Sequence, residues 1–566
     1  MVLAIAGVPG AKSKMVGQPL LYAISIFASI GVFLFGYDQG VMSGIITGPY
    51  FLAYFNRPSR SKIGTMVAVL EIGAFITSVL AGRLGDILGR RRTLFFGASV
   101  FVLGGAIQSG ATSYGIMVLG RLVSGAGVGL LSTIVPIYQS EVSPADHRGK
   151  LACIEFTGNI IGYASSVWLD YFCSFIQSHM AWRLPLLMQC VIGSILAIGS
   201  LLMPESPRWL IDHDFDELGK AVIVDLHGGD YDNPEALREF QEIKEAVMRD
   251  RESPDRSYAM MWKRYKGRVL LAMSAQAFAQ LNGINVISYY APLVFEQAGW
   301  IGRDALLMTG INALIYIAST IPTWYLVDMW GRRIILISGA AVMCIALSAT
   351  GWWIYVDQLI TPKAVVVCVI IFNAAFGYSW GPMCVAFLFY LGCEHADKEI
   401  TQSPWLYPPE IMPLTVRAKG VSLSTATNWV FNFIVGEVTP SLQELIGWRL
   451  YTMHAFFCAC SLILVYFLYP ETMGVPLEEM DAVFGEEDIL SDDDDDDDDE
   501  DEDDGLSETT SLVRDASDAS YSSPREGPRS LSPVGGDNAK RSRRWFNVFR
   551  APGKAHYTPV QGSEVG

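Results

Sequence analysis

Charge is scarce in this chain, and so are paired cysteines. Only 17% of the 566 residues are charged, whereas 51% are hydrophobic. A soluble protein of this length carries more charge, so the composition argues against a soluble globular protein. The nine cysteines are scattered through apolar stretches without the paired spacing of a disulfide framework or a zinc site. We also find no nucleophile–base set, metal cluster or phosphate-binding loop, and therefore expect neither an enzyme nor a cofactor.

The net charge of −17 comes mostly from one segment near the end of the chain. Residues 492–504 carry 13 acidic side chains, which leaves about −4 for the remainder (−17 + 13 = −4). Nothing in this balance suggests nucleic-acid binding. The tail after about residue 485 has few apolar residues and no periodicity, which predicts disorder. Its basic and aromatic stretch 540–550 is either a solvated segment or a contact for anionic lipid controlled by nearby serines.

Long apolar runs are what the chain has in abundance. A bilayer core needs roughly 20 apolar residues per helix. Twelve runs qualify: 21–46, 65–85, 93–112, 115–138, 151–172, 183–203, 268–292, 305–327, 333–355, 363–392, 417–440 and 449–470. We therefore divide the chain into an N-terminus (1–20), a first bundle (21–203), a polar linker with short helices (204–267), a second bundle (268–470) and a tail (471–566).

The two sets of six runs carry matching motifs. The stretch GRLGDILGRRR (82–92) lies between two apolar runs, and a reduced copy occupies 328–333. Repeated halves predict an all-α membrane protein of twelve helices in two pseudo-symmetric bundles, with substrate bound between them. Basic residues fall in alternate loops, which places both termini in the cytoplasm. The simpler interpretation is that the arginines only set this topology.

With these motifs in place, residues 20–480 resemble a sugar porter of the major facilitator superfamily, of the fungal type. The resemblance rests on 82–91, Pro204-Glu-Ser-Pro-Arg208, Gln280-Leu-Asn-Gly-Ile-Asn285 with Tyr289-Tyr290, 328–333 and Pro470-Glu-Thr472. It implies the major facilitator fold and a monomeric, multi-pass plasma-membrane transporter for a sugar or polyol. The competing hypothesis is a sensor that binds sugar without flux and signals through the long tail.

Asp38 lies inside the first apolar run, where a carboxylate normally needs a partner. Arg121 in the fourth run is the natural candidate. In proton-coupled members of the family an aspartate at this position pairs with that arginine, and its protonation links proton uptake to the change of access. The resemblance therefore implies proton symport. The alternative is that Asp38 only caps or supports a helix end.

A second set of charges resembles the family's cytoplasmic salt-bridge network. Its members would hold the inner side closed in the outward-facing state, and we expect them to be partly wet because they must break during transport. The alternative for any one of them is topology or solvation. They are Asp86, Arg90, Arg91, Glu141, Arg148, Glu205 and Arg208, mirrored by Asp328, Arg332, Arg333, Glu410, Arg417 and Glu471.

The substrate positions depart from the family pattern. Gln280, Asn285, Asn428 and Trp405 match it and supply amides and an aromatic face. Phe156, Ala279 and Tyr316 stand where amides are usual, and Asn312, one turn before Tyr316, is a candidate to compensate. We expect a more apolar pocket, with hexose, pentose, polyol or a larger sugar derivative all open. Ordinary packing is the alternative for Phe156 and Tyr316.

Two further features concern the gate and the tenth run. Tyr289 and Tyr290 resemble the outer gate, and Pro292 predicts a bend beside them. Residues 384–403 separate Gly381-Pro382-Met383 from Pro404-Trp405, which relatives join directly, and they contain four acidic or basic residues. We interpret this insert as a translated intron, a hypothesis that a transcript retaining the coding nucleotides would contradict. If it is real, the tenth helix is broken.

Overall fold

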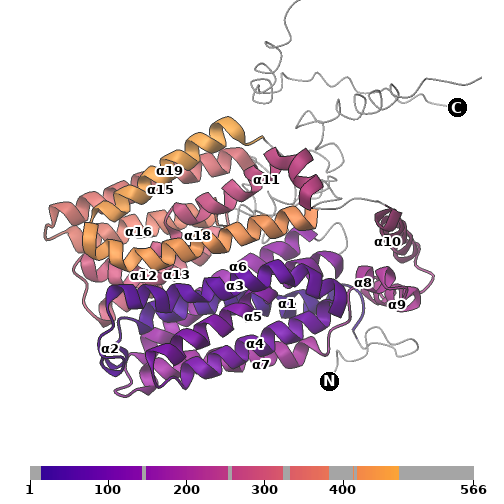
Figure 1. Ribbon diagram of the computed structural model, residues 1–566, viewed down its shortest axis with the longest axis horizontal. Coiled ribbons are helices and arrows are strands. Elements are labelled where there is room, and N and C mark those ends of the chain that lie inside the picture. Colours follow the sequence, from indigo (N-terminus) through magenta and orange to yellow (C-terminus); the bar gives the residue numbers. More distant parts are fainter. Residues whose placement is uncertain are drawn as a thin grey trace, which may run out of the picture. The chain divides into compact units, whose positions relative to one another are not determined.

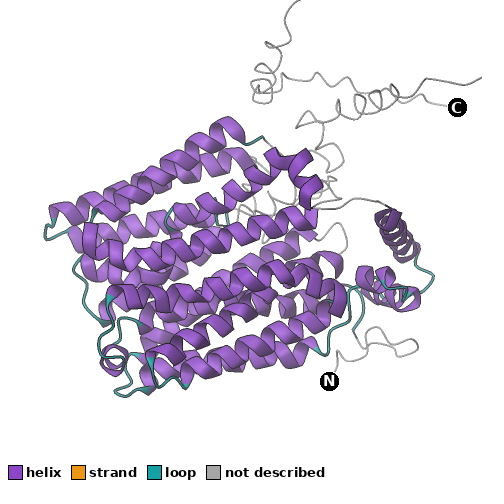
Figure 2. Cartoon of the chain, viewed as in Figure 1, coloured by secondary structure: helices purple, strands orange, loops and turns teal. Residues whose placement is uncertain are grey.

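Helices and loops make up the whole of the described chain, and no strand occurs in it (Figure 2). The computed structural model describes residues 15–142, 148–252, 258–322, 332–381, 412 and 417–470. Side chains are not described at 148–156, 249–250, 252, 332 and 417–418. The insert 384–403 and the acidic tail lie outside the described residues. The all-helical fold predicted from the apolar runs is confirmed for the described part.

The first six long helices form one half of the bundle (Figure 1). They are α1 (Gln18–Ile45), α3 (Arg60–Leu88), α4 (Arg90–Ser109), α5 (Tyr114–Val142), α6 (Arg148–Cys173) and α7 (Met180–Ser200), with the short α2 (Pro49–Tyr54) after α1. In this half α1 packs on α6, both α3 and α4 pack on α5, and α4 packs on α7. Ser59 caps α3 by accepting a hydrogen bond from the N–H of Lys62.

Three short helices follow in the polar linker: α8 (Pro207–Asp212), α9 (Asp216–Leu226) and α10 (Pro234–Glu252). The helix expected near 233–249 is present, and it begins at Pro234, whose fixed φ suits a first turn. The three helices share a small apolar core that includes Ile211, Ile223 and Val247. The linker is therefore folded and not merely a tether.

The second half begins with α11 (Tyr258–Leu281) and α12 (Ile284–Gln297). It continues with α13 (Arg303–Thr320), α15 (Arg332–Val356), α16 (Thr361–Tyr378), α18 (Arg417–Ile446) and α19 (Arg449–Leu468). Here α15 packs on α16 and α19, and α11 packs on α18. With α11 and α12 counted as one broken span, each of the twelve predicted runs contains a helix in the described residues.

The seventh predicted run, 268–292, differs from expectation because it holds two helices. The chain breaks at Gly283, which has a φ of +93°, and a Cβ there would lie 2.9 Å from the His454 ring. Both constraints favour glycine and end α11. A further kink lies at Tyr290, where φ is −126° and ψ is 19°. Pro292 follows within the same helix and has no N–H to donate, so the predicted bend is confirmed.

The surface of the long helices is apolar, as a lipid-facing surface must be. Seven of the described helices are long and apolar enough to cross a membrane: α1, α3, α5, α7, α15, α16 and α19. Large apolar side chains point outward from them, among them Ile76, Leu80, Ile198, Ile345 and Phe467, each more than half exposed. Such a surface is unfavourable in water and indicates a multi-pass membrane protein.

The two halves meet along three pairs of helices: α3 with α18, α6 with α13, and α1 with α12. We call the end at which α3 passes into α4 the motif end, and the opposite end, at which α3 begins, the far end. Near the far end Thr65 Oγ1 donates to Glu437 Oε1 at 2.7 Å, and Arg303 Nη2 donates to the carbonyl of Ser174 at 3.2 Å. Polar contacts thus join the halves at the far end.

Candidate functional site

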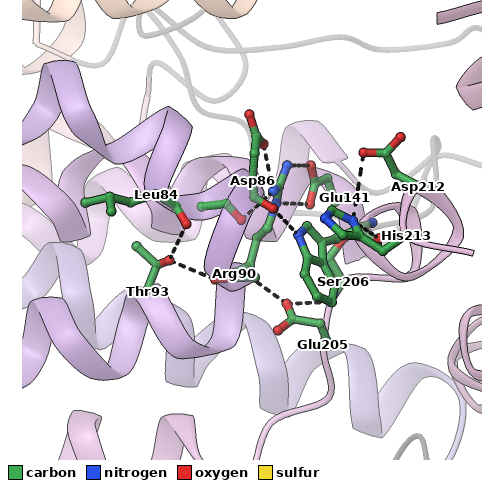
Figure 3. Close-up of polar contacts among 12 residues, drawn as sticks. Leu84, Asp86, Arg90, Thr93, Glu141, Glu205, Ser206, Asp212 and His213 are labelled. Atoms are coloured by element: carbon green, nitrogen blue, oxygen red, sulfur yellow. Dashed lines mark hydrogen bonds and ion pairs between the residues drawn. The ribbon is translucent and has the colours of Figure 1, made fainter. Parts of the chain in front are cut away.

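Glu205 caps the first turn of α4 from a distant part of the chain (Figure 3). The first N–H groups of a helix have no partner within it. The Oε1 atom of Glu205 accepts hydrogen bonds from the backbone N–H of Arg90 at 2.8 Å, of Arg91 at 3.1 Å and of Ser206 at 3.0 Å. The carboxylate also suits the positive end of the helix dipole. Burial raises the pKa of Glu205 above its usual value, and the backbone hydrogen bonds oppose that shift.

Gly89 makes this cap possible. Its φ of +89° lies in the region that favours glycine, and it turns the chain from α3 into α4. A Cβ at this position would lie 2.5 Å from the second carboxylate oxygen of Glu205. The glycine of the Gly-Arg-Arg motif is therefore needed both for the turn and for the approach of Glu205.

Arg90 joins three elements at the motif end (Figure 3). Its Nε and Nη2 atoms each donate to a different oxygen of Glu141 on α5, both at 2.8 Å. Its Nη1 atom donates to Asp86 at 2.9 Å. The Asp86 side chain is 70% exposed and the Glu141 side chain 10%. All these partners belong to the first half, so the described part of this network, with Glu205, ties the elements of that half together at its rim.

One contact of the second arginine in the Gly-Arg-Arg motif occurs in both halves. Arg91, the second residue of α4, donates to the carbonyl of Leu201, directly after α7. Arg333, the second residue of α15, donates to the carbonyl of Tyr466 near the end of α19. In each half the second arginine of a Gly-Arg-Arg motif thus reaches the end of the sixth long span. The repeat seen in the sequence is present in the contacts.

Asp38 and Arg121 form an ion pair in the interior of the first half. Arg121 Nη1 lies 2.9 Å from both carboxylate oxygens of Asp38. The side chains are 0% and 1% exposed, so the pair is closed to solvent. Gln189 on α7 donates to Asp38 Oδ1 at 2.6 Å. An adjacent cation and hydrogen bonds of this kind favour the ionised form of a carboxylate.

The rest of the Arg121 guanidinium contacts α3. Its Nε atom donates to the carbonyl of Met66 at 3.3 Å, and its Nη2 atom to the carbonyl of Val67 at 3.0 Å. Two backbone carbonyls on a neighbouring helix therefore hold the cation in place, independently of Asp38. This arrangement keeps the guanidinium partly satisfied when the carboxylate changes state.

Three of the predicted substrate residues come together in the second half. Gln280 Nε2 donates to Asn428 Oδ1 at 2.5 Å, and Asn285 Nδ2 donates to Gln280 Oε1 at 2.6 Å. Asn285 Nδ2 also lies 2.8 Å from Asn432 Oδ1, one turn after Asn428. The four side chains are buried and satisfy one another. A chain of amides can exchange these bonds for bonds to hydroxyl groups.

The aromatic part of the predicted pocket lies where the halves meet. The ring of Tyr316 on α13 packs edge-on against that of Tyr163 on α6, with centroids 6.4 Å apart. The Tyr163 hydroxyl and both amide atoms of Asn312 are buried without a hydrogen-bond partner in the described part of the chain. Ala279 is half-buried beside Gln280 on α11. Unused donors and acceptors therefore lie close to an aromatic pair.

The predicted gate tyrosines are both fully buried, and their hydroxyls are bonded. Tyr289 donates to Glu71 Oε1 on α3 at 2.5 Å. Tyr290 donates to the carbonyl of Gly436 on α18 at 2.7 Å. The Tyr289 contact crosses from the second half to the first. Of the two bonds, only the one from Tyr289 joins the halves, and it does so directly before the kink at Tyr290.

Several predicted site residues have no described geometry. Asp328, Trp405, Glu410 and Glu471 lie outside the described residues. Arg148, Phe156, Arg332 and Arg417 lie on described helices, but their side chains are not described; Arg208 lies on α8. The prediction missed Glu71, Gln189 and Asn432. Glu71 and Gln189 are polar residues within apolar runs, and Asn432 lies one turn from Asn428, so each had a signal in the sequence.

Two six-helix halves, a buried ion pair and a set of amides between apolar walls define the class of secondary membrane transporters. The chain belongs to the sugar (and other) transporter family, whose sequence model matches residues 24–392 and 399–484. The resemblance inferred from the motifs is thereby confirmed. The match is interrupted over residues 393–398, inside the predicted insert.

Relatives and solved structures agree with this assignment. The chain is 32% identical to the MFS-type transporter criB of Aspergillus cristatus, over 83% of this chain and 94% of that protein. It is 31% identical to a high-affinity glucose transporter of Kluyveromyces lactis, over 82% and 85% of the two chains. The structure is similar to that of the proton:xylose symporter XylE from E. coli, with a TM-score of 0.68 and 26% identity over 82% of this chain and 99% of that chain. The predicted major facilitator fold is confirmed.

Proposed function

We propose that this transporter takes up a small sugar or polyol across the plasma membrane by proton symport with alternating access. The ion pair of Asp38 and Arg121 carries the proposal, because a carboxylate closed to solvent inside the membrane is costly, and such residues are characteristic of functional sites. The similarity to a proton:xylose symporter supports the coupling. The similarity to a glucose transporter supports a sugar as substrate. Both relatives are transporters, which favours transport over sensing.

Proton coupling follows from what protonation does to this pair. With Asp38 ionised, the two oxygens hold one guanidinium nitrogen and so tie α1 to α5. A proton on Asp38 removes the charge attraction and turns one oxygen into a donor. Arg121 keeps its bonds to the carbonyls of Met66 and Val67 and stays on α3. The proton therefore releases α1 from α5 without leaving the cation unbonded.

Alternating access follows from where the halves touch. The cross-half hydrogen bonds to Glu71 and to Glu437 both lie toward the far end. With both termini in the cytoplasm, the far end faces outward, and this conformation is closed to the outside. The Arg90 network would then line the cytoplasmic rim of the first half, where it stiffens one half during the rocking motion.

The substrate is expected to be smaller or less polar than glucose. Gln280, Asn285 and Asn428 supply the amides, but Tyr316 brings a ring where an amide would bond another hydroxyl. Each hydroxyl left without a partner weakens binding by about 1 kcal/mol. The buried amide of Asn312, which has no hydrogen-bond partner among the described residues, can recover one such bond. A pentose, or a polyol with fewer hydroxyls than glucose, therefore suits this pocket better than a hexose does.

Uptake by yeast that lacks its own sugar carriers tests the proposal. Labelled glucose, xylose and a polyol are offered at acidic and at slightly alkaline pH, to cells expressing the chain with and without residues 384–403. We expect acid-stimulated, uncoupler-sensitive uptake that is lost in Asp38→Asn. Asp170→Asn is the matched control, since Asp170 is also buried but is not hydrogen-bonded to a side chain of the described chain. Protein at the cell surface without flux in either form would favour a sensor instead.

A further inference from the structure

In the mechanism above Glu71 serves only as the acceptor of the bond from Tyr289, although it is a second carboxylate buried in the same half. We propose that it is the alternative anionic partner of Arg121: when Asp38 takes up a proton, the guanidinium pairs with Glu71 and displaces Tyr289. This inference deepens the proposed function and rests on it. Glu71 is a positioning residue here, because it acts through Arg121 and Tyr289 and touches no substrate.

The geometry along α3 already brings the two groups close. Arg121 Nη2 is bonded to the carbonyl of Val67, and Glu71 is four residues further along the same helix. A helical side chain leans toward the N-terminus of its helix and covers the preceding turn. The Glu71 carboxylate therefore leans toward the turn on which the guanidinium lies. Its Oε2 atom is buried and has no hydrogen-bond partner in the described part of the chain.

Electrostatics favours a movement of Arg121 once Asp38 is protonated. The guanidinium stays protonated at all relevant pH values, and a buried cation without an anion is strongly unfavourable. The titratable groups that act on Glu71 are Asp38 on α1, Arg121 on α5 and Tyr289 on α12. Tyr290 beside them also faces Glu437 on α18. Arg121 is the cation of this described group. Once Asp38 is neutral, Glu71 is the carboxylate one helical turn after Val67, whose carbonyl already holds Arg121.

The proton balance is simple. One proton adds to one carboxylate oxygen of Asp38, and no other group gains or loses a proton. In this exchange Glu71 stays a carboxylate in both states, and its Oε1 atom accepts the bond from the Tyr289 hydroxyl while Asp38 is ionised. The summed charge of Asp38, Arg121 and Glu71 changes from −1 to 0. Only the pairing of the guanidinium changes with it.

The exchange connects the proton to the gate. The bond from Tyr289 to Glu71 joins the second half to the first near the far end, and Gln39 Nε2 lies 3.5 Å from the same hydroxyl. When Arg121 pairs with Glu71, Tyr289 loses its acceptor, and the hydrogen bond that joins the two halves is broken. A protonated carrier without sugar then stays open, whereas the deprotonated carrier closes. Such a rule limits proton leak without substrate.

Two substitutions should move the protonation of Asp38 in opposite directions. In Glu71→Gln, Arg121 has no second anion, so protonation needs more acid, and its midpoint falls by about one pH unit or more. In Tyr289→Phe, the state with Asp38 ionised loses the hydrogen bond to Glu71, whereas the state with Asp38 protonated loses nothing. Protonation becomes easier, and its midpoint rises by a fraction of a pH unit. A merely structural role for Glu71 predicts no such opposition.

Infrared difference spectroscopy of the purified full chain measures this midpoint without a substrate. The carboxylic-acid band that grows on acidification and is absent in Asp38→Asn reports Asp38. Glu437→Gln is the matched control, since Glu437 also accepts a cross-half bond from α3, but from Thr65, six residues before Glu71. The midpoint of Asp38 in this variant should equal that of the wild type. A wild type without such a band overturns the proton-coupling proposal itself.

The remaining outcomes test only the exchange of partners at Glu71, and not proton coupling itself. An Asp38 band whose midpoint is unchanged in Glu71→Gln contradicts it, and so does an equal shift in Glu437→Gln. If Glu71→Gln does not fold, Tyr289→Phe decides: a midpoint shifted to higher pH supports the exchange of partners, and an unchanged or lower midpoint overturns it.

Discussion

Two arginine–carboxylate clusters in the first half use the same chemistry in different surroundings. At the motif end, Arg90 lies 2.8–2.9 Å from the carboxylates of Asp86 and Glu141. In the interior, Arg121 lies 2.9 Å from Asp38. The distances agree, but the first cluster is open to solvent at Asp86 and the second is closed. An exposed pair contributes little and breaks easily, whereas a buried pair is costly to leave half-made. Burial, and not distance, separates the two.

The largest effect is expected from removing the buried cation. Arg121→Leu leaves Asp38 without its guanidinium and frees the carbonyls of Met66 and Val67. We expect the free energy of unfolding to fall by about 3–5 kcal/mol. Unfolding of the detergent-purified protein by denaturant, followed by tryptophan fluorescence, measures it.

The double variant Arg121→Leu/Asp38→Asn is the control, and it should recover part of this loss because the orphaned carboxylate is gone. Asp38→Asn alone should cost less than Arg121→Leu, since Glu71 remains as an anion for the guanidinium. Equal losses in all three variants would show that packing, and not charge, governs the site.

A smaller effect is expected at the motif end from Glu205→Ala. The substitution removes one oxygen that accepts three backbone hydrogen bonds, so the first N–H groups of α4 lose their cap. We expect a loss of about 1–3 kcal/mol in the same unfolding measurement. Glu205→Gln keeps an acceptor oxygen in the same place and should stay close to the wild type. A large loss in Glu205→Gln would instead assign the effect to the negative charge.

The pH dependence of the same pair of proteins tests the burial of Glu205. Burial raises its pKa in the folded state above the usual 4.5, so the folded state binds the proton more tightly than the unfolded state. Relative to Glu205→Gln, the wild type should gain stability as the pH falls through the raised pKa. The gain is complete below the usual carboxyl pKa. A difference between the two proteins that does not change with pH would contradict the raised pKa.

The sequence predicts the parts of this molecule that depend on composition and on local charge. Apolar runs locate the spans because a bilayer demands continuous apolar length. The contact between Asp38 and Arg121 is predictable because an embedded carboxylate needs a cation. The same logic applied to Glu71 would have marked a second site.

Other features depend on geometry between distant residues. Gly283 breaks the seventh span because its backbone conformation and the His454 ring exclude a side chain. No local pattern shows the ring in advance. The cap of α4 is equally hidden, since Glu205 reaches it from 115 residues away. The spans and the ion pair were therefore predictable, whereas the break and the cap were not.

The smallest effect is expected where the comparison began, at the exposed side of Arg90. Asp86→Asn removes a charge that is 70% exposed, so we expect a change within about 0.5 kcal/mol that shrinks further in high salt. Glu141→Gln is the matched variant on the same guanidinium. This substitution removes the negative charge that accepts two hydrogen bonds from Arg90 at a nearly buried site. It should lower the free energy of unfolding by about 1–2 kcal/mol. If both variants lower the free energy of unfolding equally, solvent exposure does not determine the strength of these pairs. The contrast with the pair of Asp38 and Arg121 must then come from the hydrogen-bond partners of that pair.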